Sequence, residues 1–140
     1  MTFLVERLAD LRKHLEHLDG LRQRVTAPED LARNLSLHND VLFSLLTICQ
    51  LVIDISGELA ARRGDRFEDY VGAVRTLVND DRFPADVVRE LERLPGFRNI
   101  LVHEYVALDM RRVVEALERL APIRTFVEVV ARIEAAPDPD

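Results

Sequence analysis

Four chemically capable residues occur together in the stretch GFRNILVHEY, residues 96–105, which is otherwise apolar: an arginine, an asparagine, a histidine and a tyrosine. Arg98 precedes His103 by five positions. A guanidinium binds phosphate oxygens through charge-assisted hydrogen bonds, and an imidazole, with an ordinary pKa of about 6.5, can transfer protons near neutral pH. The pair could therefore break phosphodiester bonds, or the two residues could lie on a solvated helix surface.

A helix is the element that would position these groups. At about 100° per residue, Arg98 and Tyr105 fall on nearly the same azimuth. Asn99 and His103 form an (i, i+4) pair on the adjacent side. The apolar residues that would hold the segment against a core are Ile100, Leu101 and Val102. We therefore expect all four polar side chains to face one groove.

Hydrophobic periodicity predicts helices along nearly the whole chain. Apart from the second helix, the expected helices cover about 3–25, 67–79, 84–94 and 110–135. The first shows apolar residues at alternating steps of three and four. The helix over 84–94 should end at Pro95–Gly96, and Asp109 is a suitable N-cap for the helix over 110–135. No alternating strand pattern, internal repeat or glycine-rich phosphate loop occurs, so the predicted fold is all-α, an antiparallel helical bundle.

The second helix is expected to be the central one. Thr26 and Glu29 form a capping-box pattern around Pro28, so a helix should begin there and run to Arg63, with Gly64 ending it. Its middle is apolar nearly all round. The exception is a stripe made of Thr47, Gln50, Asp54 and Glu58. This stripe should face water, a partner or a site.

Composition indicates one globular domain of residues 1–135 with a disordered tail over 136–140. The chain has 140 residues, of which 48% are hydrophobic and 31% charged, and no run of uninterrupted apolar residues approaches the roughly 18 that a membrane span requires. A net charge of −6 argues against nonspecific coating of nucleic acid, although a local basic cleft remains possible. The only cysteine, Cys49, lies in the apolar region and should serve packing. With no secretory pattern at the N-terminus, we expect a cytoplasmic protein.

Metal and cofactor chemistry finds little support. No histidine has a glutamate three residues before it, as di-iron bundles require. His14 and His17 are spaced one turn apart, but nothing nearby completes a ligand set, so both are expected to be exposed on a charged helix face. His38 has the same interpretation. We therefore predict no metal site and no cofactor.

The string Arg98-Asn99-Ile100-Leu101-Val102-His103-Glu104-Tyr105, preceded by Gly96-Phe97, resembles the signature of HEPN-domain ribonucleases, specifically the HepT-type toxin family. That signature is an arginine with a following polar residue, four residues between arginine and histidine, then one residue and a tyrosine. The similarity extends over about residues 4–130. It includes a long apolar second helix with an aspartate, here Asp54, a proline-started helix before the motif and a terminal amphipathic helix.

The resemblance implies a metal-independent endoribonuclease toxin of a toxin–antitoxin system. It implies a homodimer in which both copies of the motif meet in one cleft, with the ribose 2′-hydroxyl of RNA as nucleophile. His103 would then transfer protons and Arg98 would stabilise the phosphorane. Asn99 would orient His103 or a phosphate oxygen, or would be an ordinary polar residue of the helix. The second copy would supply the second histidine, since acid and base roles are easiest with two.

The same resemblance assigns Tyr105 as the residue to which a partner minimal nucleotidyltransferase, the antitoxin, transfers AMP. The added charge and bulk would repel RNA. The structural alternative for Tyr105 is a buried ring with a hydrogen-bonded hydroxyl. Asp54 would hold Arg98 or His103 across the interface, or make a structural hydrogen bond between helices. An alternative function also stays open: a noncatalytic helical dimer that binds a nucleotidyltransferase partner or a nucleotide. Neither function requires a membrane.

Overall fold

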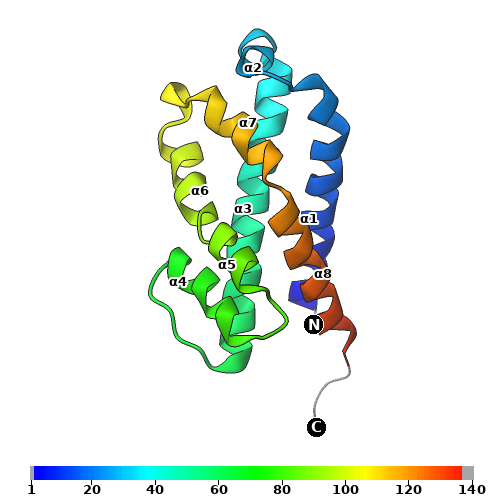
Figure 1. Ribbon diagram of the computed structural model, residues 1–140, viewed down its shortest axis with the longest axis vertical. Coiled ribbons are helices and arrows are strands. Elements are labelled where there is room, and N and C mark those ends of the chain that lie inside the picture. The colour runs from blue at the N-terminus through cyan, green and yellow to red at the C-terminus, as the bar shows by residue number, and fades with distance from the viewer. Residues whose placement is uncertain (1, 137–140) are drawn as a thin grey trace.

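The computed structural model describes residues 2–136, and every regular element within them is helical (Figure 1). The α-helices are α1 Thr2–Leu21, α2 Pro28–Arg33, α3 Leu35–Arg63, α4 Tyr70–Arg75, α5 Ala85–Leu91, α6 Leu94–His103, α7 Met110–Glu118 and α8 Ala121–Ala135. Three short 3₁₀ turns are η1 Arg22–Arg24, η2 Thr76–Asn79 and η3 Tyr105–Ala107. The predicted all-α bundle is confirmed. Of the predicted disordered tail, residues 137–140 lie outside the described range, and Ala136 is the C-cap of α8.

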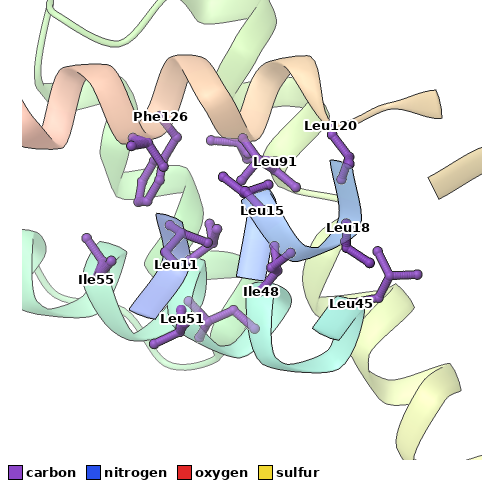
Figure 2. Close-up of a cluster of buried hydrophobic side chains, with 14 of the residues drawn as sticks. Leu11, Leu15, Leu18, Leu45, Ile48, Leu51, Ile55, Leu91, Leu120 and Phe126 are labelled. Carbon is purple, nitrogen blue, oxygen red and sulfur yellow. The ribbon is translucent and has the colours of Figure 1, made fainter. Parts of the chain in front are cut away.

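The long helix α3 is the centre of the bundle, as predicted. Helix α3 runs antiparallel to α1, and α6 and α4 also pack against α3 (Figure 1). The leucine stripe of α1 is buried over its whole length: Leu4, Leu8, Leu11, Leu15 and Leu18. Figure 2 shows Leu11 and Leu15 between Ile48 of α3 and Phe126 of α8. Burial of this stripe against α3 and α8 therefore holds the first, central and last helices together.

The start of the predicted second helix differs from the expectation. The predicted continuous helix is interrupted at Asn34, whose backbone is extended (φ −130°, ψ 101°) and whose side chain accepts a hydrogen bond from the Leu37 amide. Asn34 is thus the N-cap of α3. The capping box is shifted by one residue, because the Asp30 carboxylate, not Glu29, accepts from the Thr26 and Ala27 amides. The end at Gly64 is confirmed, and its φ of 79° is one that glycine adopts without strain.

Other predicted boundaries were also wrong. The helix predicted over 67–79 begins only at Tyr70, behind the N-cap Asp69, and finishes as η2. Pro95–Gly96 was expected to end a helix, but Pro95 lies in the first turn of α6. Proline is accepted there because the backbone N–H groups of the first turn have no acceptor within the helix. The helix predicted over 110–135 is broken between α7 and α8, with Pro122 in the first turn of α8. Asp109 is the N-cap of α7, as predicted.

Helix α3 is the one described helix that is long and apolar enough to cross a membrane. In this fold, 61% of its most apolar 18-residue window is buried inside the protein. Its apolar surface is explained by the neighbours that cover it, so it serves as the core helix of the bundle.

Candidate functional site

Helix α6 positions the polar cluster. Pro95 and Leu101 are buried and seat the helix on α3, with Phe97 and Ile100 partly buried beside them. The helix ends at His103, because Glu104 leaves the helical conformation (φ −121°, ψ 27°) and the chain continues as η3. The predicted shared azimuth of Arg98 and Tyr105 was therefore wrong. Those two residues belong to different elements.

Arg98 is held by a chain of side-chain hydrogen bonds. Its Nε donates to Gln50 Oε1 at 3.0 Å, and Gln50 Nε2 donates to Asp54 Oδ1 at 2.9 Å. A terminal guanidinium nitrogen of Arg98 donates to Asn99 Oδ1 at 3.1 Å. The guanidinium also lies 5.5 Å from the centre of the Tyr70 ring. These contacts fix the orientation of Arg98 and leave further N–H groups for an anion.

Gln50 contacts Arg98 directly, although the sequence did not predict it as a residue of the site. It links α3 to α6 across 48 positions of sequence, and its only signal was membership of the polar stripe on the central helix. Asp54 was expected to hold Arg98 or His103 across an interface, or to bridge two helices. Within the described chain it accepts from Gln50 of its own helix, and it reaches Arg98 only through that side chain.

His103 lies exposed at the end of α6, and within residues 2–136 it has no side-chain hydrogen bond or ion pair. Five residues along a helix correspond to a rise of about 7.5 Å and a turn of about 140°. Arg98 and His103 therefore leave different sides of α6, with Arg98 turned toward Gln50. Asn99 is exposed and accepts from Arg98. One copy of the chain thus presents one imidazole and one anchored guanidinium.

Tyr105 has features of both hypotheses, the AMP acceptor and the structural residue with a hydrogen-bonded hydroxyl. Its ring is 45% exposed, and its hydroxyl donates to Asn39 Oδ1 on α3 at 2.7 Å. The ring also meets the edge of His38, with centroids 5.6 Å apart. His38 is therefore half-buried against a neighbour, where an exposed residue was expected. The hydrogen bond of the hydroxyl lies in an exposed position.

Three exposed apolar side chains, here called the apolar surface, lie on the elements that carry this cluster. Phe43 of α3 is 63% exposed, Val102 of α6 is 41% exposed and Val106 of η3 is 99% exposed. Phe43 and Tyr105 also line a shallow cavity of about 270 Å³ between α3 and α6. Large apolar side chains that gather on one face commonly mark a contact surface.

The remaining histidines have structural roles. His14, expected to be exposed, is half-buried, and its Nδ1 lies 3.0 Å from the Oγ of buried Ser44 on α3. Burial lowers the pKa of His14, partly opposed by Asp10. His17 Nε2 lies 2.7 Å from Asp40 Oδ1. No group of three or more histidine, cysteine, aspartate or glutamate residues suited to a metal ion occurs within residues 2–136.

Cys49 packs in the core, as predicted. It is only 1% exposed, and burial raises the pKa of its thiol to about 12. A thiol with that pKa stays protonated near neutral pH and is a poor nucleophile. Cys49 therefore serves packing.

The comparison with known protein families agrees with this geometry. The family model "Ribonuclease HepT-like" matches residues 11–130, which include α6, its motif and most of the bundle. The chain belongs to the HepT-like ribonuclease family.

Similar proteins and structures agree with this assignment. Two Archaeoglobus fulgidus proteins named "Putative RNase" are 28% and 27% identical to the chain over 110 and 120 residues. These matches cover 78% and 86% of the chain, and 83% and 84% of the relatives. A tri-AMPylated Shewanella oneidensis HEPN toxin, solved in complex with its MNT antitoxin, has a TM-score of 0.78 at 18% identity. That similarity covers 92% of this chain and 96% of the toxin.

A chain of a mutant MntA–HpeT toxin–antitoxin complex also has a TM-score of 0.78, at 16% identity. Here the similarity covers 94% of this chain and 99% of the other. At such identities the two solved structures establish the HEPN toxin fold of this chain.

Proposed function

We propose that this chain is a metal-independent endoribonuclease toxin that cleaves RNA at a cleft between two copies of itself. The observation that carries the proposal is the pairing of a hydrogen-bonded, oriented guanidinium with an exposed imidazole on one short helix. Membership of the HepT-like ribonuclease family supports the same reaction class. The cytoplasm, where a substrate RNA is found, is the proposed location.

The proposed reaction follows from the charges and protonation states of the two groups. The RNA 2′-hydroxyl attacks the adjacent phosphorus, the 5′-oxygen of the next nucleotide leaves, and a 2′,3′-cyclic phosphate remains. His103 removes or returns a proton in this step, because an imidazole exchanges protons near neutral pH. Arg98, already oriented by Gln50, stabilises the charge that develops on the phosphorane. Asn99 keeps the guanidinium in place and lies beside the phosphate.

A homodimer would complete the site. One copy supplies one motif histidine, His103, and this side chain leaves a different side of α6 from Arg98. The exposed Phe43, Val102 and Val106 would be covered by the second copy, since such apolar side chains gain by leaving water. The twofold axis would then place two guanidinium groups and two imidazoles around one cleft.

The proposed regulator is a minimal nucleotidyltransferase that attaches AMP to Tyr105. The half-exposed ring and the hydroxyl held by Asn39 suit an acceptor beside the cleft. The similar Shewanella toxin is AMPylated and bound to an MNT antitoxin, which supports the same arrangement here. Each added AMP brings a negative charge to a site for RNA phosphate and would reduce substrate binding.

Cleavage of RNA by the purified chain in the presence of EDTA tests the nuclease. Removing a positioned proton-transfer group commonly costs about 10²- to 10⁴-fold in rate. We expect a loss in that range for His103→Ala and for Arg98→Ala, with the melting temperature unchanged for His103→Ala, whose side chain has no hydrogen bond within residues 2–136. The matched controls His17→Ala and Arg12→Ala should retain wild-type rates. Equal cleavage by all four variants would contradict the proposal. Specific binding of RNA or of the nucleotidyltransferase without cleavage would favour the noncatalytic alternative.

Mass spectrometry of the chain coexpressed with the nucleotidyltransferase tests the regulation. We expect one or more AMP additions on Tyr105, and none on Tyr105→Phe. Tyr70 is the only other tyrosine in the chain, so Tyr70→Phe is the matched control and should be modified like the wild type. Modification that persists in Tyr105→Phe would contradict the assignment of the acceptor.

A further inference from the structure

A second cavity lies apart from the polar cluster, between α6 and α7 with α3 as its floor. Its volume is about 460 Å³. The floor is made by Leu45, Ile48 and Cys49, all of them buried. Figure 2 shows Leu45, Ile48, Leu91 and Leu120, four of its lining residues, among the core side chains that approach one another from α3, α5 and the α7–α8 junction.

The cavity is open to solvent at its rim, where Arg93, Arg112 and Arg119 are exposed. Pockets that bind small molecules have volumes of about 300 to 1,000 Å³ and mostly apolar walls with a few polar groups. This cavity meets both criteria, because its walls include Phe97, Ile100 and Ile123 and charged residues stand at its rim.

The charges at the rim favour an anion. The rim carries Arg93, Arg112 and Arg119 together with Glu90 and Glu115. Arg93 and Glu90 face each other at 3.8 Å. Within residues 2–136, neither Arg112 nor Arg119 takes part in an ion pair or a side-chain hydrogen bond. Arg112 lies in the first turn of α7 and Arg119 is the C-cap of that helix, so the two arginines are seven positions and about two turns apart on one side. Glu115 is the remaining carboxylate of the cavity beside these two arginines, and Asp109, outside the cavity, also interacts electrostatically with Arg112.

We propose that this cavity binds an amphipathic anion, a molecule with an apolar chain and a single anionic head group. The apolar chain lies on Ile48 and against Phe97 and Ile100, where it is removed from water. The head group lies between Arg112 and Arg119, whose guanidinium groups suit carboxylate or phosphate oxygens. Phe97 and Ile100 belong to the motif helix, so the ligand contacts α6 away from the side on which Arg98 meets Gln50.

The proposal does not depend on the nuclease activity, and methyl NMR of the full chain tests it. The probe is decanoate, kept below the concentration at which it forms micelles. Three of the isoleucines line the cavity, Ile48, Ile100 and Ile123, whereas Ile53, Ile55 and Ile133 do not. We expect saturable, one-to-one shifts at the first three methyl groups and small shifts at the other three.

Variants and a neutral probe distinguish the contribution of the two arginines from that of the apolar walls. Arg112→Gln combined with Arg119→Gln should weaken decanoate binding at least tenfold, and decanol should bind the wild type at least tenfold more weakly than decanoate. The matched control, Arg12→Gln with Arg24→Gln, changes two exposed arginines outside the cavity and should bind normally. Ala116→Phe, which would fill the cavity, should abolish the shifts.

Three results would overturn the proposal. Absence of saturable shifts, or equal shifts at all six isoleucines, would show that the cavity binds no such ligand. Equal binding of decanol and decanoate, or an unchanged affinity in the double arginine variant, would show that the site does not recognise an anionic head group. Shifts at the three cavity methyl groups that depend on protein concentration without any probe would identify a second copy of the chain as the occupant.

Discussion

The two sides of α3 differ in the interactions that hold their neighbours. Toward α1, fully buried apolar side chains such as Leu11 and Ile48 pack together, beside two polar contacts made by the histidines of α1. Toward α6, half-buried Asp54 and Gln50 form a chain of hydrogen bonds that ends at Arg98. Apolar burial has no preferred direction and contributes about 25 cal/mol per Å², whereas a hydrogen bond contributes about 1 kcal/mol net but fixes orientation. The α1 side therefore sets stability, and the α6 side orients the guanidinium.

The largest expected effect concerns the apolar side. Leu11→Ala should lower the free energy of unfolding by about 2–5 kcal/mol, because it removes buried methyl groups and leaves a cavity. Denaturant unfolding measures this. RNA cleavage per folded molecule should be unchanged, and Arg12→Ala, an exposed neighbour, should affect neither quantity. A Leu11→Ala variant that stayed as stable as the wild type would remove the distinction between the two sides.

The next effect concerns the polar side. Gln50→Leu removes the acceptor of Arg98 Nε, and hydrogen bonds to charged groups contribute about 1.5–3 kcal/mol. We expect kcat/KM for RNA to fall about 10- to 100-fold, since about 1.4 kcal/mol corresponds to a factor of ten. The control is Thr47→Val in the same stripe, because within residues 2–136 the Thr47 hydroxyl bonds only to the Phe43 carbonyl. Unchanged cleavage by Gln50→Leu would show that Arg98 needs no such support.

A smaller effect is expected at the start of α3. Asn34→Ala removes the side-chain cap on the Leu37 amide and should cost about 1 kcal/mol of stability. Asn34→Asp keeps an acceptor at this position and should cost only a few tenths of that amount. Thermal melting of the two variants measures the difference. Equal melting temperatures for Ala and Asp at this position would mean that the break between α2 and α3 does not depend on the cap.

The smallest effect is a pH dependence. Burial lowers the pKa of His14 below its ordinary value of 6.5, so the unfolded chain binds the proton more readily. Stability from this residue is therefore present above pH 6.5 and is lost as the pH falls through the lowered folded value. In His14→Gln this loss between pH 7 and pH 5 should be smaller, as followed by denaturant unfolding. An identical pH profile for wild type and His14→Gln would contradict the assignment.

The helices were predictable where local spacing decides them. The leucine stripe of α1 is correct because every third or fourth position is apolar, and Gly64 ended α3 because glycine adopts a positive φ easily. Pro95 misled the prediction, because the same residue that stops one helix is accepted in the first turn of the next. The split between α7 and α8 had Pro122 as its only local signal.

The sequence predicts the residue types of the candidate site but not their geometry. Arg98, His103 and Tyr105 are recognised from their spacing, yet nothing in the string indicates that the helix ends at His103 and separates Tyr105 from Arg98. The contact between Arg98 and Gln50 joins residues 48 positions apart, and only tertiary packing brings them together. Periodicity placed Gln50 on a polar stripe without indicating its partner.

The central claim is that two copies of α6 meet across the apolar surface, and a distance between spin labels tests it most directly. Val106→Cys introduces a thiol on the most exposed residue of that surface, while Cys49 is buried and should not react. Packed helices have axes about 10 Å apart, so two labels at position 106 should lie below about 25 Å from each other in the dimer. A longer distance, or no dipolar coupling at all, would contradict a shared cleft.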